Sequence, residues 1–221
     1  MKLEAFVFQF LEDLSKNNNR VWFKGHESDY KKVIESVRQF TTELIGKISA
    51  FDKSVEGQTY KTCIYRIYKD IRFSKDKTPY KNHIGVYIAP DGNHGQKAGY
   101  YLHIESGNVL FSGGLWCPPK ELLKKIRTEI YYDPQSLLKI LNNKQFQQTF
   151  GSLTDDDKLT RPPKGFDVDF EHIELLKYKS FCVLKHATNQ QALADDFMDL
   201  CVAVFKTVQP LNAYMNEIID F

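Results

Sequence analysis

The spacing of the hydrophobic residues changes twice along this chain, and this change restricts the fold more than any other sequence feature. Apolar residues recur at helical spacing over residues 3–50, and they alternate or form β-rich runs over residues 61–116. Helical spacing returns over residues 118–220, with one late strand at Phe181–Leu184. Helices followed by a sheet and then by more helices are typical of the α+β class.

The β-rich region divides into four runs that proline and glycine turns separate. These runs are Cys63–Phe73, His83–Ala89, Gly99–Glu105 and Val109–Phe111. Consecutive strands without helices between them usually pair as antiparallel neighbours. We therefore predict an antiparallel meander sheet of about four to five strands. N-terminal and C-terminal helices are expected to pack with it, in a single domain over residues 1–221.

Cysteines and apolar runs indicate the compartment. The four cysteines form no C-x-x-C pair, so neither a zinc ribbon nor a thioredoxin-type motif is present. The chain has no run of about 18 apolar residues, and its first residues lack the pattern of a signal peptide. These features predict a cytoplasmic protein with no membrane partner, and they leave the oligomeric state open.

The charge of the chain is unevenly distributed. Lysine and arginine number 30 against 28 acidic residues, and this net charge of +2 excludes a broadly basic protein. Residues 61–81 nevertheless hold seven basic and two acidic residues, so the remainder is net acidic. This segment predicts attraction to an anion. The alternative is a solvated strand edge whose lysines discourage aggregation.

Side-chain alternation divides the predicted strands between two faces. Cys63, Tyr65, Ile67, Ile71 and Phe73 are expected to face the core. The opposite, polar face is expected to carry Arg66, Asp70, Arg72, His83, Tyr87, Tyr101, His103 and Glu105. Arginine, histidine and tyrosine bind carboxylate or phosphate groups and move protons. Two interpretations stay open, a ligand site and a hydrogen-bonded structural network.

We hypothesise that this polar face binds a small anionic ligand, with phosphorylated molecules included. The residues expected to bind it are Arg66, Arg72, Lys75, Lys77, Tyr80, Lys81, Tyr101 and Arg161. Arg161 begins a stiff stretch, Arg161–Gly165, that is expected to lie over the face as a lid. The candidate acid and base groups are His83, His103, Asp70 and Glu105. Whether the domain is an enzyme stays open.

Three other functions compete with the ligand site. A metal-dependent enzyme would use His83, His103 and Glu105 as a two-histidine, one-carboxylate set. A nucleic-acid-binding module would use the basic segment 61–81, although the nearly neutral total charge disfavours it. In an interaction protein, the polar face would have only a structural role and would bind no ligand. The sequence has no P-loop, dinucleotide fingerprint or nucleophile elbow, so no cofactor is predicted.

Several strings in the sequence resemble one widespread family. They are NNRxWF at Asn18–Phe23, preceded by Asn17, YRxYxDxRFSxDKTPYK at Tyr65–Lys81, GYYLHxE at Gly99–Glu105, GGxWxP at Gly113–Pro118 and RPPKGF at Arg161–Phe166. The family comprises conserved hypothetical proteins, mainly bacterial and also fungal, with a domain of unknown function. The chain departs from the pattern at Ser112, where a third glycine is expected. The resemblance covers nearly the whole chain and implies a single domain, but it implies no activity.

Overall fold

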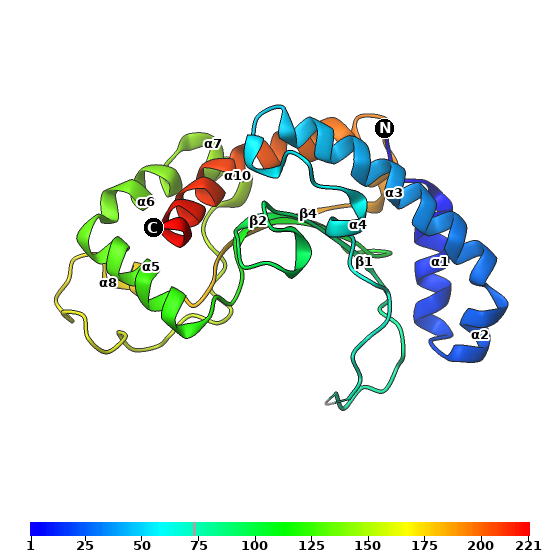
Figure 1. Cartoon of the computed structure of the whole chain (residues 1–221), viewed down its shortest axis with the longest axis horizontal. Helices are drawn as coiled ribbons and strands as arrows, with labels where there is room; N and C mark the ends of the chain where they lie inside the picture. Colours follow the sequence, from blue (N-terminus) through cyan, green and yellow to red (C-terminus); the bar gives the residue numbers. More distant parts are fainter. Residues whose placement is uncertain (73) are drawn as a thin grey trace.

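A four-stranded antiparallel sheet forms the centre of the fold (Figure 1). In the computed structural model, which describes residues 1–72 and 74–221, the strand order is β1-β2-β3-β4. The strands are β1 (Ile84–Ile88), β2 (Gly99–Ile104), β3 (Val109–Leu115) and β4 (Phe181–Ala187). The predicted α+β class is confirmed, and β4 is the predicted late strand.

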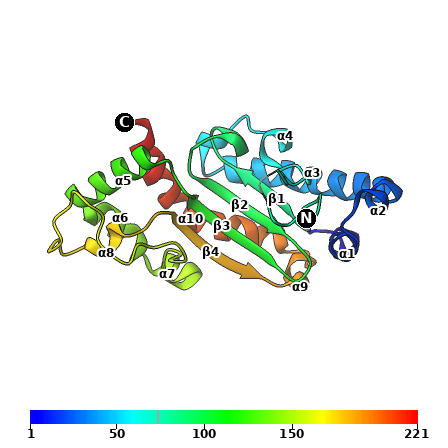
Figure 2. The ribbon, with the colours of Figure 1, turned by 90° about the horizontal axis from the view of Figure 1, so that it is seen from below.

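Helices precede β1, separate β3 from β4 and follow β4. They are α1 (Ala5–Lys16), α2 (Arg20–Gly25), α3 (Glu27–Ser49), α4 (Tyr60–Cys63), α5 (Lys120–Tyr132), α6 (Pro134–Leu141), α7 (Lys144–Phe150), α8 (Ile173–Leu176), α9 (Asn189–Ala192) and α10 (Phe197–Asp220), with 3-10 turns at Lys53–Val55 and Gly92–His94. Figure 1 shows α3 and α10 across one face of the sheet. Figure 2 views the other face, where the strands lie in front of these helices. The sheet therefore has a covered face and an open face.

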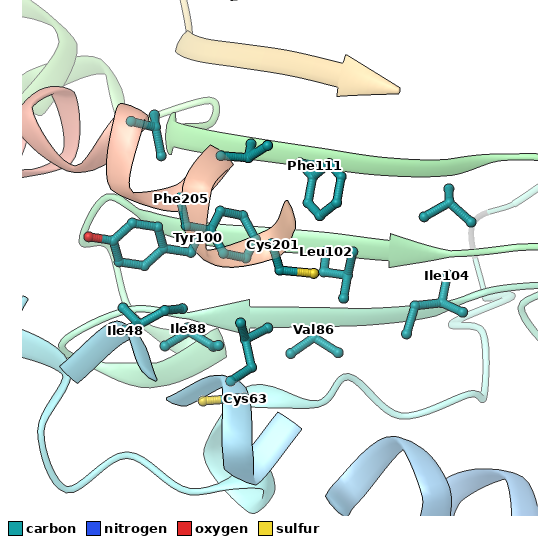
Figure 3. Packing of buried hydrophobic residues seen from close by; sticks show 14 of the residues in the cluster. Ile48, Cys63, Val86, Ile88, Tyr100, Leu102, Ile104, Phe111, Cys201 and Phe205 are labelled. Atoms are coloured by element: carbon teal, nitrogen blue, oxygen red, sulfur yellow. The ribbon is translucent and has the colours of Figure 1, made fainter. Parts of the chain in front are cut away.

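The covered face forms the hydrophobic core with α3 and α10. Strand pairing places Leu102 between Val86 and Phe111, and Figure 3 shows these side chains beside one another. Phe111 is fully buried, and its ring centre lies 5.7 Å from that of Phe205 and 5.9 Å from that of Phe197, both on α10. Burying one such side chain stabilises a fold by about 1.5–3 kcal/mol.

The predicted strand Cys63–Phe73 is wrong. Helix α4 ends at Cys63, and beyond it the described chain makes only two isolated bridges, Ile64 to Val86 and Tyr68 to Tyr80. Residues 66–72 and 74–82 belong to a long loop that projects from the sheet in Figure 1, and we call these residues the basic loop. The sheet therefore begins at β1 and not near residue 61.

Short polar side chains explain why the basic loop leaves the sheet. The Asp70 carboxylate accepts a hydrogen bond from the backbone N–H of Arg72 at 3.2 Å, and Asp76 accepts one from that of Thr78 at 2.9 Å. The Ser74 hydroxyl accepts from the N–H of Asp76 at 3.1 Å. These local bonds occupy donors that a strand ladder would need, so they favour turns.

Regular alternation also stops where the basic loop begins to turn. Of the residues expected in the core, Cys63 and Ile67 are buried, whereas Tyr65 and Ile71 are half-buried. Phe73 lies outside the described residues. The prediction for this face is therefore correct at Cys63, where α4 ends, and at Ile67, but not at Tyr65 or Ile71.

The stretch between α7 and α8 packs at the end of the molecule away from α1 and α2 (Figures 1 and 2). The ring centres of Phe166 and Phe170 lie 5.6 and 4.8 Å from that of Tyr131 on α5. Arg161–Gly165 therefore lies beside α5 and α8, and the expected lid over the polar face is wrong. Aromatic anchoring on α5 is the physical reason.

Candidate functional site

Polar side chains gather on the open face of the sheet. Strand pairing places Tyr101 of β2 between Tyr87 of β1 and Ser112 of β3, and it places His103 beside Gly85. His83 and Glu105 flank β1 and β2 at the same end of this face, where both contact His103. The structure therefore brings together the two histidines, Tyr101 and Glu105.

His103 lies at the centre of a hydrogen-bonded chain. Its Nδ1 is 3.1 Å from the Tyr101 hydroxyl, and its Nε2 is 3.0 Å from Glu105 Oε2. Asn82 and Asn108 donate hydrogen bonds to the two carboxylate oxygens of Glu105. Because a carboxylate only accepts, we assign a proton to His103 Nε2, which allows Nδ1 to accept from the Tyr101 hydroxyl.

Burial and hydrogen bonding determine which of these linked side chains, Tyr101 and Glu105, carry a proton. Burial raises the pKa of Tyr101 to about 12, so its hydroxyl stays protonated at neutral pH. Burial also favours the neutral form of Glu105, but hydrogen bonds from His103 and Asn108 outweigh it and lower the Glu105 pKa. A phenol, an imidazole and a carboxylate linked in this way can hold and pass a proton.

His83 stacks on His103, with ring centres 4.3 Å apart and planes at 27°. Burial, assisted by the nearby His103, lowers the pKa of His83 from 6.5 to about 4. His83 is therefore neutral at pH 7. Its Nδ1 lies 3.4 Å from Asn82 Oδ1, which can only accept, so the proton belongs on Nδ1.

This pKa predicts how stability depends on pH. Between pH 6.5 and about 4, the unfolded chain protonates residue 83 while the folded protein keeps it neutral, so stability falls as the pH falls through this window. We expect a loss of about 1–2 kcal/mol, less than the whole pKa shift would give, because the ring is partly solvated. Urea unfolding across this pH range should show that the free energy of unfolding falls less steeply with pH for His83→Phe than for the unaltered protein. Phenylalanine keeps an aromatic ring that can stack on His103 but cannot take up a proton. Equal pH slopes would contradict the prediction.

The charge of Lys81 acts on His83, and a second cation, Arg66, lies near Lys81. Lys81 is half-buried, and its Nζ lies 5.3 Å from the centre of the Tyr65 ring. Burial and the charge of Arg66 lower the pKa of Lys81. In the described part of the chain, neither Lys81 nor Arg66 has a carboxylate oxygen within 4.0 Å. Lys81 therefore brings to this side of the cluster a positive charge that forms no ion pair within the described chain.

Asp70 and Arg72 form an exposed ion pair on the basic loop, at 2.7 Å, rather than part of the sheet face. Side-chain and backbone hydrogen bonds from Arg72 lower the pKa of Asp70 to about 2. Their predicted position beside His103 is therefore wrong. That position assumed that residues 63–73 form a strand of the sheet, whereas the structure has the turns of the basic loop there.

Apart from Lys81, the lysines of the basic loop make local contacts or are exposed. Lys69 pairs with Asp76 at 2.8 Å, and Lys77 Nζ donates to the backbone oxygen of Ile71 at 2.9 Å. Lys75 is exposed. These contacts reduce the charge that the loop can offer to a polyanion, so they weaken the nucleic-acid hypothesis.

Two other predicted ligand residues also lie elsewhere. Tyr80 is buried, and its ring stacks on Phe23 of α2 at a centre-to-centre distance of 4.0 Å. The Asn18 side chain holds the backbone of Tyr80, donating to its C=O at 2.9 Å and accepting from its N–H at 3.1 Å. Arg161 is exposed in the stretch beside α5 and α8. Neither residue joins the histidine pair.

The predicted metal ligands form a different arrangement. Among residues 1–72 and 74–221, no group of three His, Cys, Asp or Glu side chains is arranged to hold a metal ion. His103 uses both ring nitrogens in hydrogen bonds to Tyr101 and Glu105. His83, His103 and Glu105 are thus linked by stacking and a hydrogen bond.

Sequence reasoning missed several parts of this site. Asn82 and Asn108 were not predicted to hold Glu105, and their one signal was a position beside a strand end, where asparagine is common. Tyr65 was expected in the core, yet it lines a pocket of about 780 Å³ with Tyr101 and the exposed Trp116. This pocket adjoins the hydrogen-bonded chain at Tyr101.

Comparison with known protein families identifies a match. A family model described as "Conserved hypothetical protein (DUF2461)" matches residues 6–214. Neither a curated protein nor a solved structure matches the chain significantly. Within the described residues, no helix combines the length and the apolar character that crossing a membrane requires.

Proposed function

The chain belongs to this family of conserved hypothetical proteins, DUF2461, and we propose that it binds a small anion on the open face of its sheet. The observation that carries the proposal is the position of Lys81 beside one of two stacked histidines and near Arg66, with no carboxylate oxygen within 4.0 Å of either cation in the described chain. A cytoplasmic location agrees with four cysteines that are all free thiols.

The two cations supply the attraction. Arg66 and Lys81 repel each other, and burial together with this repulsion lowers the pKa of Lys81. An anion bound between them would remove the repulsion. It would also form charge-assisted hydrogen bonds, which are about twice as strong as neutral ones. The site therefore favours phosphate or carboxylate over a neutral ligand.

The histidines define the ligand further. Neutral His83 has its proton on Nδ1, so its Nε2 is an acceptor. A ligand that has both a negative charge and a hydroxyl, such as monohydrogen phosphate, would satisfy the cations and this nitrogen together. The neighbouring Tyr101–His103–Glu105 chain supports acid–base chemistry on such a ligand.

Calorimetric titration with inorganic phosphate tests the proposal. We expect Lys81→Gln to weaken phosphate binding about tenfold or more, the effect of losing one charge-assisted hydrogen bond. Lys124→Gln removes the same charge from an exposed position on α5, so it should leave the affinity within about twofold. Equal affinities for the two variants would contradict the proposal.

A single-stranded oligonucleotide is the second probe. If it binds more tightly than phosphate and its affinity falls steeply with salt, the nucleic-acid alternative replaces the small anion. A small-anion site predicts weak oligonucleotide binding and a shallow salt dependence.

A further inference from the structure

A second pocket, of about 1030 Å³, lies between α2, α3 and the basic loop. It has no lining residue in common with the pocket beside Tyr101. Five basic and two acidic side chains line it, together with apolar groups such as Ile34 and Pro79. Its volume is at the upper end of the range for small-molecule sites.

Three tyrosines surround Phe23 in this pocket. The ring centre of Phe23 lies 4.0 Å from that of Tyr80, 5.1 Å from that of Tyr30 and 6.2 Å from that of Tyr68. In the described part of the chain, none of the three hydroxyls makes a hydrogen bond to another residue. The pocket therefore has phenol donors whose bonding capacity the protein itself does not use.

Arginine charges act on these phenols. Burial raises the pKa of Tyr30 and of Tyr80, the proximity of Tyr68 raises both further, and the charges of Arg38 and Arg20 respectively oppose these increases. The tyrosines therefore influence one another, and each of the first two also lies within the field of a guanidinium group.

The cations of the pocket divide into paired and unpaired ones. Lys31 pairs with Glu27 at 3.1 Å, and Arg38 lies 3.5 Å from Glu35, both within α3. Arg20 and Lys24 of α2 have no carboxylate oxygen within 4.0 Å in the part of the chain that the structure describes. These two are available to bind an anion.

We infer that this pocket is a second binding site, for an organic phosphate that carries an aromatic ring. Arg20 and Lys24 would hold the phosphate, and the tyrosine hydroxyls would donate hydrogen bonds to its remaining oxygens. This inference is independent of the proposed site on the sheet, since it involves different residues and a separate pocket.

The number of available cations favours a small molecule over a nucleic acid. Two unpaired cations suit one or two phosphate groups, whereas a nucleic-acid-binding surface typically makes six or more phosphate contacts. The pocket is also bounded by the basic loop, which Asn18 holds in place through the backbone of Tyr80.

Tyr68 favours an aromatic ligand. Its side chain is 53% exposed although its ring packs 5.3 Å from that of Tyr80. A large aromatic side chain that is half exposed at a pocket offers a surface on which a flat ring can stack. An inorganic ion would leave this surface in contact with water.

Tryptophan fluorescence provides a local measurement. The chain has two tryptophans, so Trp116→Phe leaves Trp22 of α2 as the only one. In the Trp116→Phe variant, titration with phenyl phosphate or with adenosine monophosphate should change the Trp22 fluorescence until it reaches a constant value at saturation. Inorganic phosphate should bind more weakly than either. Arg20→Gln with Lys24→Gln should weaken binding of both organic phosphates about 100-fold, or tenfold for each charge.

Matched variants test whether binding depends on this pocket. Lys32→Gln removes an exposed charge from α3 outside the pocket lining, so it should leave the affinities unchanged. Tyr68→Ala should weaken phenyl phosphate binding but not inorganic phosphate binding. Lys81→Gln, which tests the sheet site, should leave the Trp22 signal intact. The inference is overturned if neither organic phosphate binds, or if the Arg20 and Lys24 variant behaves like Lys32→Gln.

Discussion

Replacing Gly114 by alanine is expected to lower the free energy of unfolding by about 4–5 kcal/mol, an exceptionally large effect for one methyl group. A Cβ at this position would lie 2.0 Å from the carbonyl oxygen of Phe181 on β4, and the backbone φ is +107°. The Gly114 N–H also donates to the buried Asn212 Oδ1 of α10 at 2.7 Å. The backbone of β3 or β4 would have to move, and this hydrogen bond would be disturbed.

Gly107→Ala is the matched control. Gly107 also has a positive φ, of +78°, but a Cβ there would meet no atom within 4 Å. It should therefore show only the conformational cost, about 1–2 kcal/mol. Urea unfolding of both variants measures the difference, and equal losses would mean that steric contact between β3 and β4 is not the cause. If Gly114→Ala fails to fold while Gly107→Ala folds, the loss of stability at Gly114 exceeds the expected value, which also supports the prediction.

Replacing Asn18 by alanine is expected to destabilise the protein by about 2–3 kcal/mol and to release the basic loop. The Asn18 amide makes two hydrogen bonds to the backbone of Tyr80, at 2.9 and 3.1 Å. Alanine removes both and leaves the partly buried Tyr80 N–H and C=O without these partners. Urea unfolding measures the loss, and tryptic cleavage after Lys69 and Arg72 should become faster.

Asn17→Ala is the control for this second variant. The Asn17 side chain donates one exposed hydrogen bond, to the backbone oxygen of Asp13 at 3.0 Å. Its loss should cost less than about 1 kcal/mol and leave the rate of loop cleavage unchanged. If the two variants unfold and are cleaved alike, Asn18 does not hold the loop.

The periodic parts of the fold could be predicted from the sequence. The stripes of α3 and α10 and the alternation in β1 and β2 each put one face into the core, and burial is what makes such patterns regular. The same alternation put Tyr101, His103 and Glu105 on one face, because residues two apart in a strand must share a side.

The basic loop could not be predicted in this way. The β-rich composition of Cys63–Phe73 indicates a strand, but the side chains of Asp70, Ser74 and Asp76 accept hydrogen bonds from backbone N–H groups two residues further on and override that preference. Partners of the site that come from turns, such as Asn82 and Asn108, depend on backbone conformation that periodicity does not specify. The pocket between α2, α3 and this loop depends on the Asn18–Tyr80 contact, which joins residues 62 apart in sequence.

The position of α10 has a consequence during synthesis. This helix, Phe197–Asp220, packs on β3 and supplies Phe205 and Asn212 to the sheet. A nascent chain that has reached only β3 therefore exposes an apolar sheet surface, and it must wait for about a hundred further residues before that surface can be covered. At about 5–20 residues per second, this interval lasts about 5–20 seconds. This face of the sheet is therefore covered only after α10 has been synthesised.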